Sequence, residues 1–437
     1  MSVRKLIWFL MALLPLAVSC RDANFSIDDT SGGGVPGEPD RRQDVKVTRN
    51  VMVMVSGGHN NLCPYLTADL QEMAEGYLPQ GDFPENQVSN VLMILSRLKV
   101  NGFSTTSVPV LYRLYRDLQG NPVRDTLMVW GSEDRMFSGT VIKDALSFIH
   151  DTYPADSYGM VVSSHASGWL PPYYYNNPSA FEKGPAAAPR SIGQDDDNGV
   201  SVEMDLMDFT NSIPFRLNYL VLDCCLSGGV EVAWALRGKV DRLAFTQTET
   251  MAEGFDYSKI VSRLVGSATP DPMGVCQDFY EYYMAQTGVM QSATISFVEM
   301  SRLDALASVC ATLFDKYRAQ IAALTDADEK VDPYDYSKGY KVQRYFRDLV
   351  GSAPRHYFYD LKDILVKAGI TAGEEEQLDA ALQACIQYKA ATPWFMDNFP
   401  ILHHCGLSMY LPARGSAYLD TYYKENIAWN QATHLVL

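Results

Sequence analysis

Short apolar runs constrain the fold of this chain more than any other feature of its sequence. They are Val51–Val55, Tyr158–Ser163, Leu217–Leu222 and Val240–Thr246. Runs of this length and composition are typical of strands that are buried on both faces of a sheet. Segments 142–153 and 228–236, which lie between the runs, space their apolar residues as helices do. Strands that alternate with helices predict an α/β fold, with a mostly parallel sheet and helices on both faces.

Other segments give further expectations. Residues 108–115 and 127–130 are expected to be strands, and residues 84–98 have helical spacing. After residue 300 the pattern predicts a mainly helical region. Its expected helices span 302–325, 335–349, 358–368 and 374–390, and a late strand covers Leu407–Leu411.

The N-terminus is expected to be a targeting segment. Arg4 and Lys5 precede an apolar run over 6–18, which is shorter than the ~20 residues that span a bilayer. The run ends in Leu-Ala-Val-Ser-Cys, which resembles the lipobox of bacterial lipoproteins and would make Cys20 the lipidated residue. The alternative is a plain signal peptide. Residues 21–46 are rich in Gly, Pro and Asp and are expected to form a flexible tether. The expected location is the cell envelope, lipid-anchored, on either membrane face.

Composition excludes several classes of protein. The chain has 437 residues and a formal net charge of −16, which disfavours binding to a nucleic-acid backbone. A hydrophobic content of 47% is too high for a disordered protein. None of the eight cysteines forms a Cys-x-x-Cys pair, so a zinc ribbon or a thioredoxin-type site is not expected.

Reactive side chains follow two of the apolar runs directly. His165 comes after the run that ends at Ser163, and Cys225 comes after the run that ends at Leu222. Ligands of open parallel sheets bind beyond the carboxyl ends of the strands, where these two residues would meet. A histidine there supplies the base that a cysteine nucleophile needs. A helix expected just after Cys225 would favour the thiolate through its N-terminal field.

Three motifs in this order resemble the clostripain-type cysteine peptidases. The first is His165-Ala-Ser-Gly-Trp169, and the second is Asp223-Cys-Cys-Leu226 followed by Val230-Glu-Val-Ala233. The third is Gly406-Leu-Ser-Met-Tyr-Leu-Pro412. The resemblance implies a caspase-like fold and a cysteine endopeptidase. Together with the segment patterns above, it gives the expected organisation: a lipoprotein signal peptide (1–20), a flexible tether (21–46), a caspase-like catalytic domain (47–300) and a mainly helical C-terminal region with a late strand (301–437).

The resemblance also implies roles for single residues. Cys225 would be the nucleophile, chosen over Cys224 by the Asp-x-Cys spacing, and His165 would be the general base and acid. Asp223 would lie in the pocket for the P1 side chain, where a carboxylate suits Arg or Lys. Glu253 is a second candidate for that pocket, with a solvated surface position as its alternative.

Two backbone N–H groups, those of Ala166 and Cys225, would form the oxyanion hole. The family commonly has Gly where this chain has Ala166, and Ala resists a positive φ. The long connection over residues 171–200 includes Lys183 and Arg190, which are candidate sites of self-cleavage by a protease specific for basic residues.

No cofactor is required by this chemistry, and no metal site is predicted. The run Asp195-Asp-Asp197 is expected to be a solvated turn, with calcium as the alternative. His403 and His404 beside Cys405 are expected to be structural. The expected partners are peptides or proteins with basic residues and, through the lipid, a membrane.

Two other functions compete with this interpretation. A serine hydrolase needs Gly-x-Ser-x-Gly, and the sequence around Ser227 lacks the first Gly. A catalytically inactive surface lipoprotein of the same fold could bind peptide or glycan instead of cleaving it.

Overall fold

The computed structural model describes most of the chain after residue 47. The described residues are 48–81, 90–98, 108–174, 178–181, 192–197, 200–346, 357–396, 399–412 and 414–437. The predictions for residues 1–46, including Cys20, and those for Lys183 and Arg190 lie outside these ranges. Among the described residues, no helix is long and apolar enough to cross a lipid bilayer.

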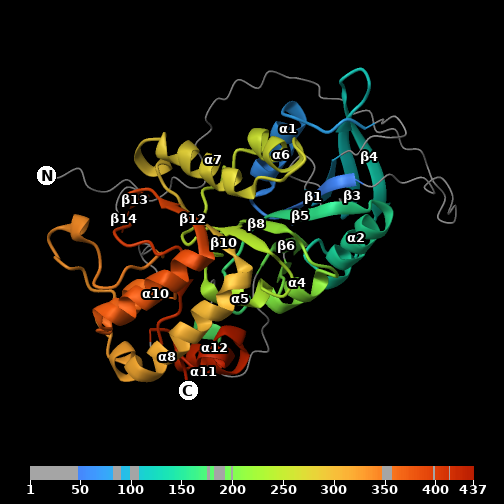
Figure 1. Cartoon of the computed structure of the whole chain (residues 1–437). Helices are drawn as coiled ribbons and strands as arrows, with labels where there is room; N and C mark the ends of the chain where they lie inside the picture. Colours follow the sequence, from blue (N-terminus) through green and yellow to red (C-terminus); the bar gives the residue numbers. More distant parts are fainter. Residues whose placement is uncertain are drawn as a thin grey trace, which may run out of the picture.

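A mostly parallel sheet forms the centre of the molecule, which confirms the predicted fold class (Figure 1). Its nine described strands run in the order β12-β10-β9-β8-β5-β1-β2-β3-β4. Parallel pairing joins β2, β1, β5, β8 and β9, and antiparallel strands extend the sheet on both sides. The strand bounds are β1 Thr48–Gly57, β2 Val91–Arg97, β3 Val110–Arg116, β4 Pro122–Val129, β5 Ala155–Ser163, β8 Tyr219–Asp223, β9 Arg242–Phe245, β10 Thr294–Glu299 and β12 Ile386–Ala391.

Helices cover both faces of the sheet and make the molecule a three-layer structure (Figure 1). One face carries α1 (Cys63–Glu75), α6 (Tyr257–Val265) and α7 (Pro272–Met284), and an apolar cluster lies beneath them. The other face carries α2 (Gly139–Thr152), α4 (Leu206–Ser212), α5 (Val230–Leu236) and α8 (Leu303–Ala322) over a larger cluster. Burying apolar side chains on both faces is what makes the central strands apolar throughout.

The last third of the chain packs on the second face and also contributes to the sheet. Its helices are α9 (Leu361–Lys367), α10 (Ala372–Cys385), α11 (Ala417–Asn426) and α12 (Ala428–Thr433). Strand β12 follows α10 directly and pairs with β10. The short strand β15 (Ser408–Met409) pairs with β11 (Tyr359–Asp360), and Ser408 also forms a bridge with Gly229. One apolar cluster therefore runs from Val51 to Leu435.

Short elements complete the structure. Strands β6 (Gln194–Asp197) and β7 (Val200–Glu203) form a hairpin, and β13 (Trp394–Phe395) pairs with β14 (Phe399–Pro400). Helix α3 spans Pro178–Phe181, and single 3-10 turns lie at Gly288–Met290, Met300–Arg302 and Tyr336–Lys338.

Three predicted elements are wrong in part. Residues 91–97 of the expected helix 84–98 form strand β2, because this stretch lies in the middle of the sheet and is apolar on both faces. The expected helix 335–349 has only a 3-10 turn among its described residues. The expected helix 374–390 ends at Cys385, after which the chain becomes strand β12.

Candidate active site

Strand pairing brings the two predicted reactive residues to one edge of the sheet. In the parallel pair β5–β8, Ser163 lies opposite Asp223. His165 and Cys225 each follow two residues later, so both leave the sheet at its carboxyl edge. Strand β1 ends at the same edge, since Ser56 lies opposite Ser163. The site is therefore built on the ends of three adjacent strands.

The two adjacent cysteines differ in access. Cys224 is 1% exposed, and its thiol points to the carbonyl of Val162 at 3.5 Å. Cys225 is partly exposed, and its Sγ accepts a hydrogen bond from the N–H of Thr250 at 3.3 Å. Only the second thiol is open to a substrate, which supports the choice made from the Asp-x-Cys spacing.

A strained turn presents Cys225. Leu226, the next residue, has φ = 56°, a conformation that residues other than glycine rarely adopt. Its N–H donates to the carbonyl of Thr248 at 2.9 Å, and the N–H of Gly228 donates to Thr246. The segment after β9 therefore holds the turn in place.

The histidine motif packs directly on this turn. Gly168 has φ = 63°, and a Cβ built on it would lie 2.4 Å from the carbonyl oxygen of Leu226. Only glycine fits this close approach. Gly168 is thus the residue of the histidine motif that has a left-handed backbone. Ala166 is not among the described residues with positive φ. The concern that Ala166 would be strained therefore does not apply.

The imidazole of His165 has a close polar neighbour that the sequence analysis missed. Its Nε2 lies 2.6 Å from Oδ1 of Asn61, in the loop that follows β1. The backbone carbonyl of His165 accepts a hydrogen bond from the N–H of Gly193 at 2.9 Å, and Ala166 pairs with Ile192. The rule that located His165 and Cys225, polar residues beyond a strand end, also applies to Asn61.

The thiol and the imidazole are both neutral at rest. Burial raises the pKa of Cys225 to about 12, with further contributions from the charges of Glu249 and Asp223. Burial lowers the pKa of His165, against the opposing field of Asp196. The expected helix field does not produce a resting thiolate, because α5 begins only at Val230 and burial of the thiol outweighs every other influence on its pKa.

Asp223 is a buried carboxylate whose charge acts on the thiol of Cys225. It is 6% exposed and accepts hydrogen bonds from Ser163 Oγ at 3.1 Å and from Tyr257 Oη at 2.7 Å. Burial raises its pKa to about 6. Gly254 has φ = 61°, and a Cβ there would lie 2.5 Å from Asp223 Oδ2, so the glycine leaves room for the carboxylate.

A second buried carboxylate, which the sequence analysis missed, faces Asp223. Asp69 lies on the inner face of α1 and is 5% exposed. Burial raises its pKa to about 9, and the charges of Asp223 and Glu72 add to the shift. Among the described residues, neither Asp69 nor Asp223 forms an ion pair. The signal in the sequence was an acidic residue between Leu66 and Met73 on an apolar helix face.

Glu253, the other predicted pocket residue, is exposed and precedes Gly254. Burial raises the pKa of Tyr283, and the charges of Asp223 and Glu253 add to the shift. The Tyr283 hydroxyl donates to the carbonyl of Gly254 at 2.8 Å. Glu253 thus lies at the surface, while Asp69 and Asp223 are buried.

The aspartate run over residues 195–197 forms part of strand β6 and is not the expected solvated turn. Asp195 is fully buried and forms an ion pair with Arg97, and its other oxygen accepts the N–H of Met136 at 2.7 Å. The run forms strand β6 because this pair fixes it to β2. No three His, Cys, Asp or Glu side chains converge to hold a metal in the part of the chain that the structure describes.

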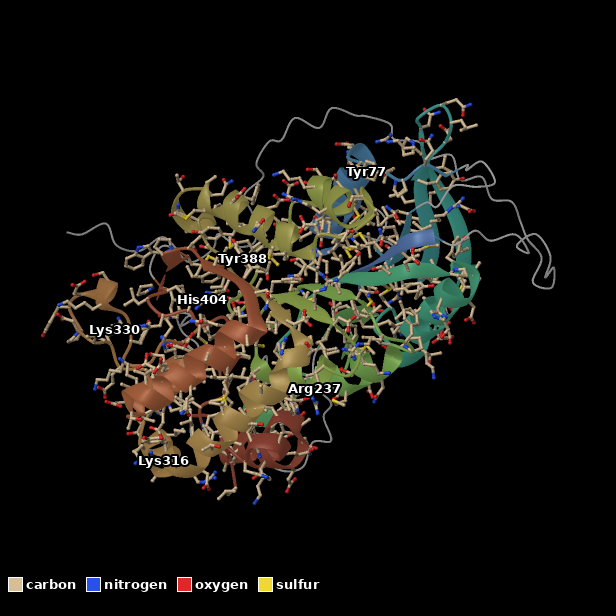
Figure 2. The ribbon with its side chains drawn as sticks, viewed as in Figure 1. Tyr77, Arg237, Lys316, Lys330, Tyr388 and His404 are labelled. Carbon is tan, nitrogen blue, oxygen red and sulfur yellow. The ribbon has the colours of Figure 1, made fainter. Side chains whose placement is uncertain are left out.

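The histidines near the C-terminus differ from His165. His404, labelled in Figure 2, makes a 2.8 Å hydrogen bond from its Nε2 to Oε1 of Gln247. Burial lowers the pKa of His404 to about 4. Gln247 also donates to the carbonyl of Gly406 at 2.9 Å, so this histidine helps to join the late strand region to the segment after β9.

A sequence model of the clostripain family matches residues 54–425, which include His165, Cys225, Asp223 and the other side chains of this site. The chain belongs to the clostripain family. Membership makes it a cysteine-type peptidase, and the family's substrates are peptides or proteins. No curated protein sequence matches the chain.

Solved structures of clostripain-family proteases share the fold. An inactive zymogen of a C11 protease from Parabacteroides distasonis superposes with a TM-score of 0.67 at 22% identity, covering 89% of this chain and 99% of that one. A secreted C11 cysteine protease from Bacteroides thetaiotaomicron, in complex with an irreversible peptide inhibitor, gives 0.65 at 21% identity, with coverage of 89% and 99%. These similarities establish the caspase-like fold.

Proposed function

We propose that this peptidase is an endopeptidase that cleaves after Arg or Lys by means of a Cys225–His165 dyad. The observation that carries the specificity is the pair of buried carboxylates Asp223, whose charge acts on Cys225, and Asp69, on which the charge of Asp223 also acts. Two buried carboxyl groups without a cation are unfavourable, as their raised pKa values indicate. The guanidinium or ammonium group of a P1 side chain would supply the missing positive charge.

The proposed reaction begins with both groups of the dyad neutral. The Cys225 thiol passes its proton to the His165 imidazole while Sγ attacks the carbonyl carbon of the scissile bond. The N–H groups of Ala166 and Cys225 stabilise the oxyanion; no acceptor from another described residue occupies either group. The imidazolium then donates its proton to the leaving amine, and water hydrolyses the thioester.

The test is a panel of fluorogenic peptides that differ only at P1. The wild-type protein is expected to cleave Arg and Lys peptides at least about 100-fold faster than Gln or Met peptides, because a buried charge pair is worth several kcal/mol. Cys225→Ala is expected to abolish cleavage, with Cys224→Ala as the matched control that keeps it. Equal cleavage of neutral and basic peptides would refute the specificity.

We further propose that the enzyme processes itself in the connection between Phe181 and Ile192, at Lys183 or Arg190. Basic specificity supports this, and one structural relative is described as a zymogen. The intact mass of the purified wild type would then show two chains, and that of Cys225→Ala one. A single, equal mass for both proteins would remove the proposal.

The location in the cell envelope, anchored through a lipid on Cys20, is likewise a proposal. It is supported by the lipobox-like sequence and by a structural relative described as secreted. Radiolabelled palmitate should label the wild-type protein and leave Cys20→Ser unlabelled. Label on neither protein would favour the plain signal peptide, and label on both would exclude Cys20 as the lipidated residue.

A further inference from the structure

The loop after strand β1 brings an amide group to the imidazole of His165. Oδ1 of Asn61 lies 2.6 Å from Nε2 of His165. An amide oxygen can only accept a hydrogen bond, so the ring nitrogen that faces it carries the proton. The other nitrogen, Nδ1, then has its lone pair free. The contact therefore selects one of the two neutral tautomers of the imidazole.

The loop that carries Asn61 is fixed by backbone contacts on both sides. The N–H of Gly58 donates to the carbonyl of Arg97 at 2.9 Å, and the carbonyl of Gly58 accepts from the N–H of Asp196 at 2.8 Å. Nδ2 of the neighbouring Asn60 donates to the carbonyl of Gln194 at 2.9 Å. The loop is thus fastened to β2 and to β6.

Strand β6 and the residues before it also hold the histidine. The N–H of Gly193 donates to the carbonyl of His165 at 2.9 Å, and the N–H of Gln194 donates to Ser164 Oγ at 3.2 Å. One short segment, residues 192–196, therefore sets the position of Asn61 and that of His165 relative to each other. The buried ion pair between Asp195 and Arg97 anchors this segment in the core.

We infer that Asn61 is the positioning residue of the catalytic imidazole: it keeps Nε2 protonated, leaves Nδ1 as the base for the Cys225 thiol, and orients the imidazolium that forms. The inference rests on the proposed dyad. Asn61 would act beside Cys225 and His165, and the chemical steps proposed above would stay the same. The proton taken from Sγ goes to Nδ1, and the same nitrogen returns it to the leaving amine.

The first test is a kinetic comparison of Asn61 variants on the best basic peptide. Asn61→Ala is expected to lower kcat about 10- to 100-fold with little change in KM, because a misoriented base slows the chemical step and leaves P1 binding intact. Asn61→Asp keeps an acceptor at the same place and is expected to recover most of kcat. Gln71→Ala, which removes an exposed amide from α1, is the matched control and should retain wild-type kcat.

The second test reads the tautomer without activity. In a Cys225→Ala background, long-range ¹H–¹⁵N spectra of the histidine rings should show His165 with the proton on Nε2. The His165→Gln variant assigns the signal. Adding Asn61→Ala should shift this signal toward a mixture of tautomers. An unchanged tautomer in the Asn61→Ala protein would overturn the inference, and this measurement also applies if the variant is inactive for another reason.

The outcomes separate the inference from the function on which it rests. If Cys225→Ala still cleaves peptides, the proposed dyad fails, and the role of Asn61 fails with it. If Cys225→Ala is inactive while Asn61→Ala keeps the wild-type kcat, the dyad stands and only the inference about Asn61 is refuted.

Discussion

The thiol of Cys225 is protonated in the free enzyme, whereas in some cysteine enzymes the resting cysteine is a thiolate. Burial and the nearby charges of Glu249 and Asp223 raise its pKa to about 12. In the proposed mechanism the reactive thiolate therefore forms only when a substrate is bound and His165 takes the proton. A reagent that does not bind as a basic substrate is proposed to bind should meet an unreactive thiol at neutral pH.

Alkylation by iodoacetamide tests this state of Cys225. The rate is expected to be low at pH 7 and to rise about tenfold per pH unit up to pH 10, because only the thiolate reacts. Glu249→Gln removes a charge that raises the thiol pKa and should increase the rate at each pH. The Cys225→Ala protein gives the background from the other cysteines. A rate that is already at a plateau at pH 7 would contradict a protonated resting thiol.

The carboxyl group of Asp69 opposes stability in the free enzyme. Its pKa is about 9 in the folded chain against 3.8 for an ordinary Asp, so the folded state binds the proton more tightly than the unfolded state does. Stability is then highest below the unfolded pKa and falls as pH rises toward the folded pKa. A buried group that costs stability is a candidate for a functional role, and the role proposed above for Asp69 is the recognition of a basic P1 side chain.

Asp69→Asn separates these two effects. The variant should be more stable than the wild type at pH 8, by at least about 1 kcal/mol, and nearly equal to it at pH 4. It should also lose at least about tenfold in kcat/KM for Arg and Lys peptides, with neutral peptides unaffected. Thermal unfolding across this pH range and the P1 panel measure both. A variant that keeps full basic preference would show that Asp69 does not contact P1.

Buried strand patterns were the part of the structure that sequence reasoning predicted best. Strands β1, β5, β8 and β9 were all expected, because sheets covered on both faces require apolar runs. The same argument failed for β2, since the polar residues before Val91 gave the longer segment a helix-like spacing. Strand β12 was missed because it continues from α10 without a turn residue.

The site residues also differ in how well the sequence predicts them. His165, Cys225 and Asp223 follow apolar runs and carry family motifs, so sequence alone could place them at one edge. Asn61 also lies beyond a strand end, but its contact with His165 depends on the conformation of the loop after β1. Asp69 lies on a helix, and its contacts depend on how that helix packs. Asp195 was misjudged because its partner Arg97 lies 98 residues away in the chain. Pairs at such separations are set by the tertiary fold and leave no local pattern.

The ion pair between Arg97 and Asp195 fastens the hairpin β6–β7 to strand β2. Both side chains are at most 1% exposed. Arg97→Met would leave the Asp195 carboxylate buried and unpaired, at a cost of about 3–5 kcal/mol in the free energy of unfolding. The expected consequence is also a loss of activity, because the same hairpin supports His165 and the Asn61 loop.

The exposed pair Arg216–Asp241 provides a matched control for this element. Its side chains are 48% and 37% exposed, so Arg216→Met should cost less than about 1 kcal/mol. Urea unfolding of both variants measures the difference. Similar small losses for the two would mean that the buried pair does not anchor the hairpin.

The whole molecule is held together across the expected boundary at residue 300. Glu231 of α5 is buried, and its Oε1 accepts hydrogen bonds from the N–H of Tyr410 at 2.9 Å and from Tyr423 Oη at 2.8 Å. The carbonyl of Gly228, in the turn that presents Cys225, accepts from the N–H of Ser408 at 2.8 Å. The late third motif of the family therefore supports the nucleophile turn directly.

A chain cut after residue 300 tests whether residues 48–300 form an independent domain. We expect it to lack cooperative unfolding and peptide cleavage, because Glu231 would lose both partners and β10 would lose its neighbour β12. The matched control is a full-length chain nicked by an inserted protease site at Tyr334, which is 95% exposed and far from these contacts. The nicked protein keeps every partner and should stay folded and active. Cooperative unfolding and activity of the fragment 48–300 alone would establish that the C-terminal region is an addition to a complete catalytic domain rather than part of its core.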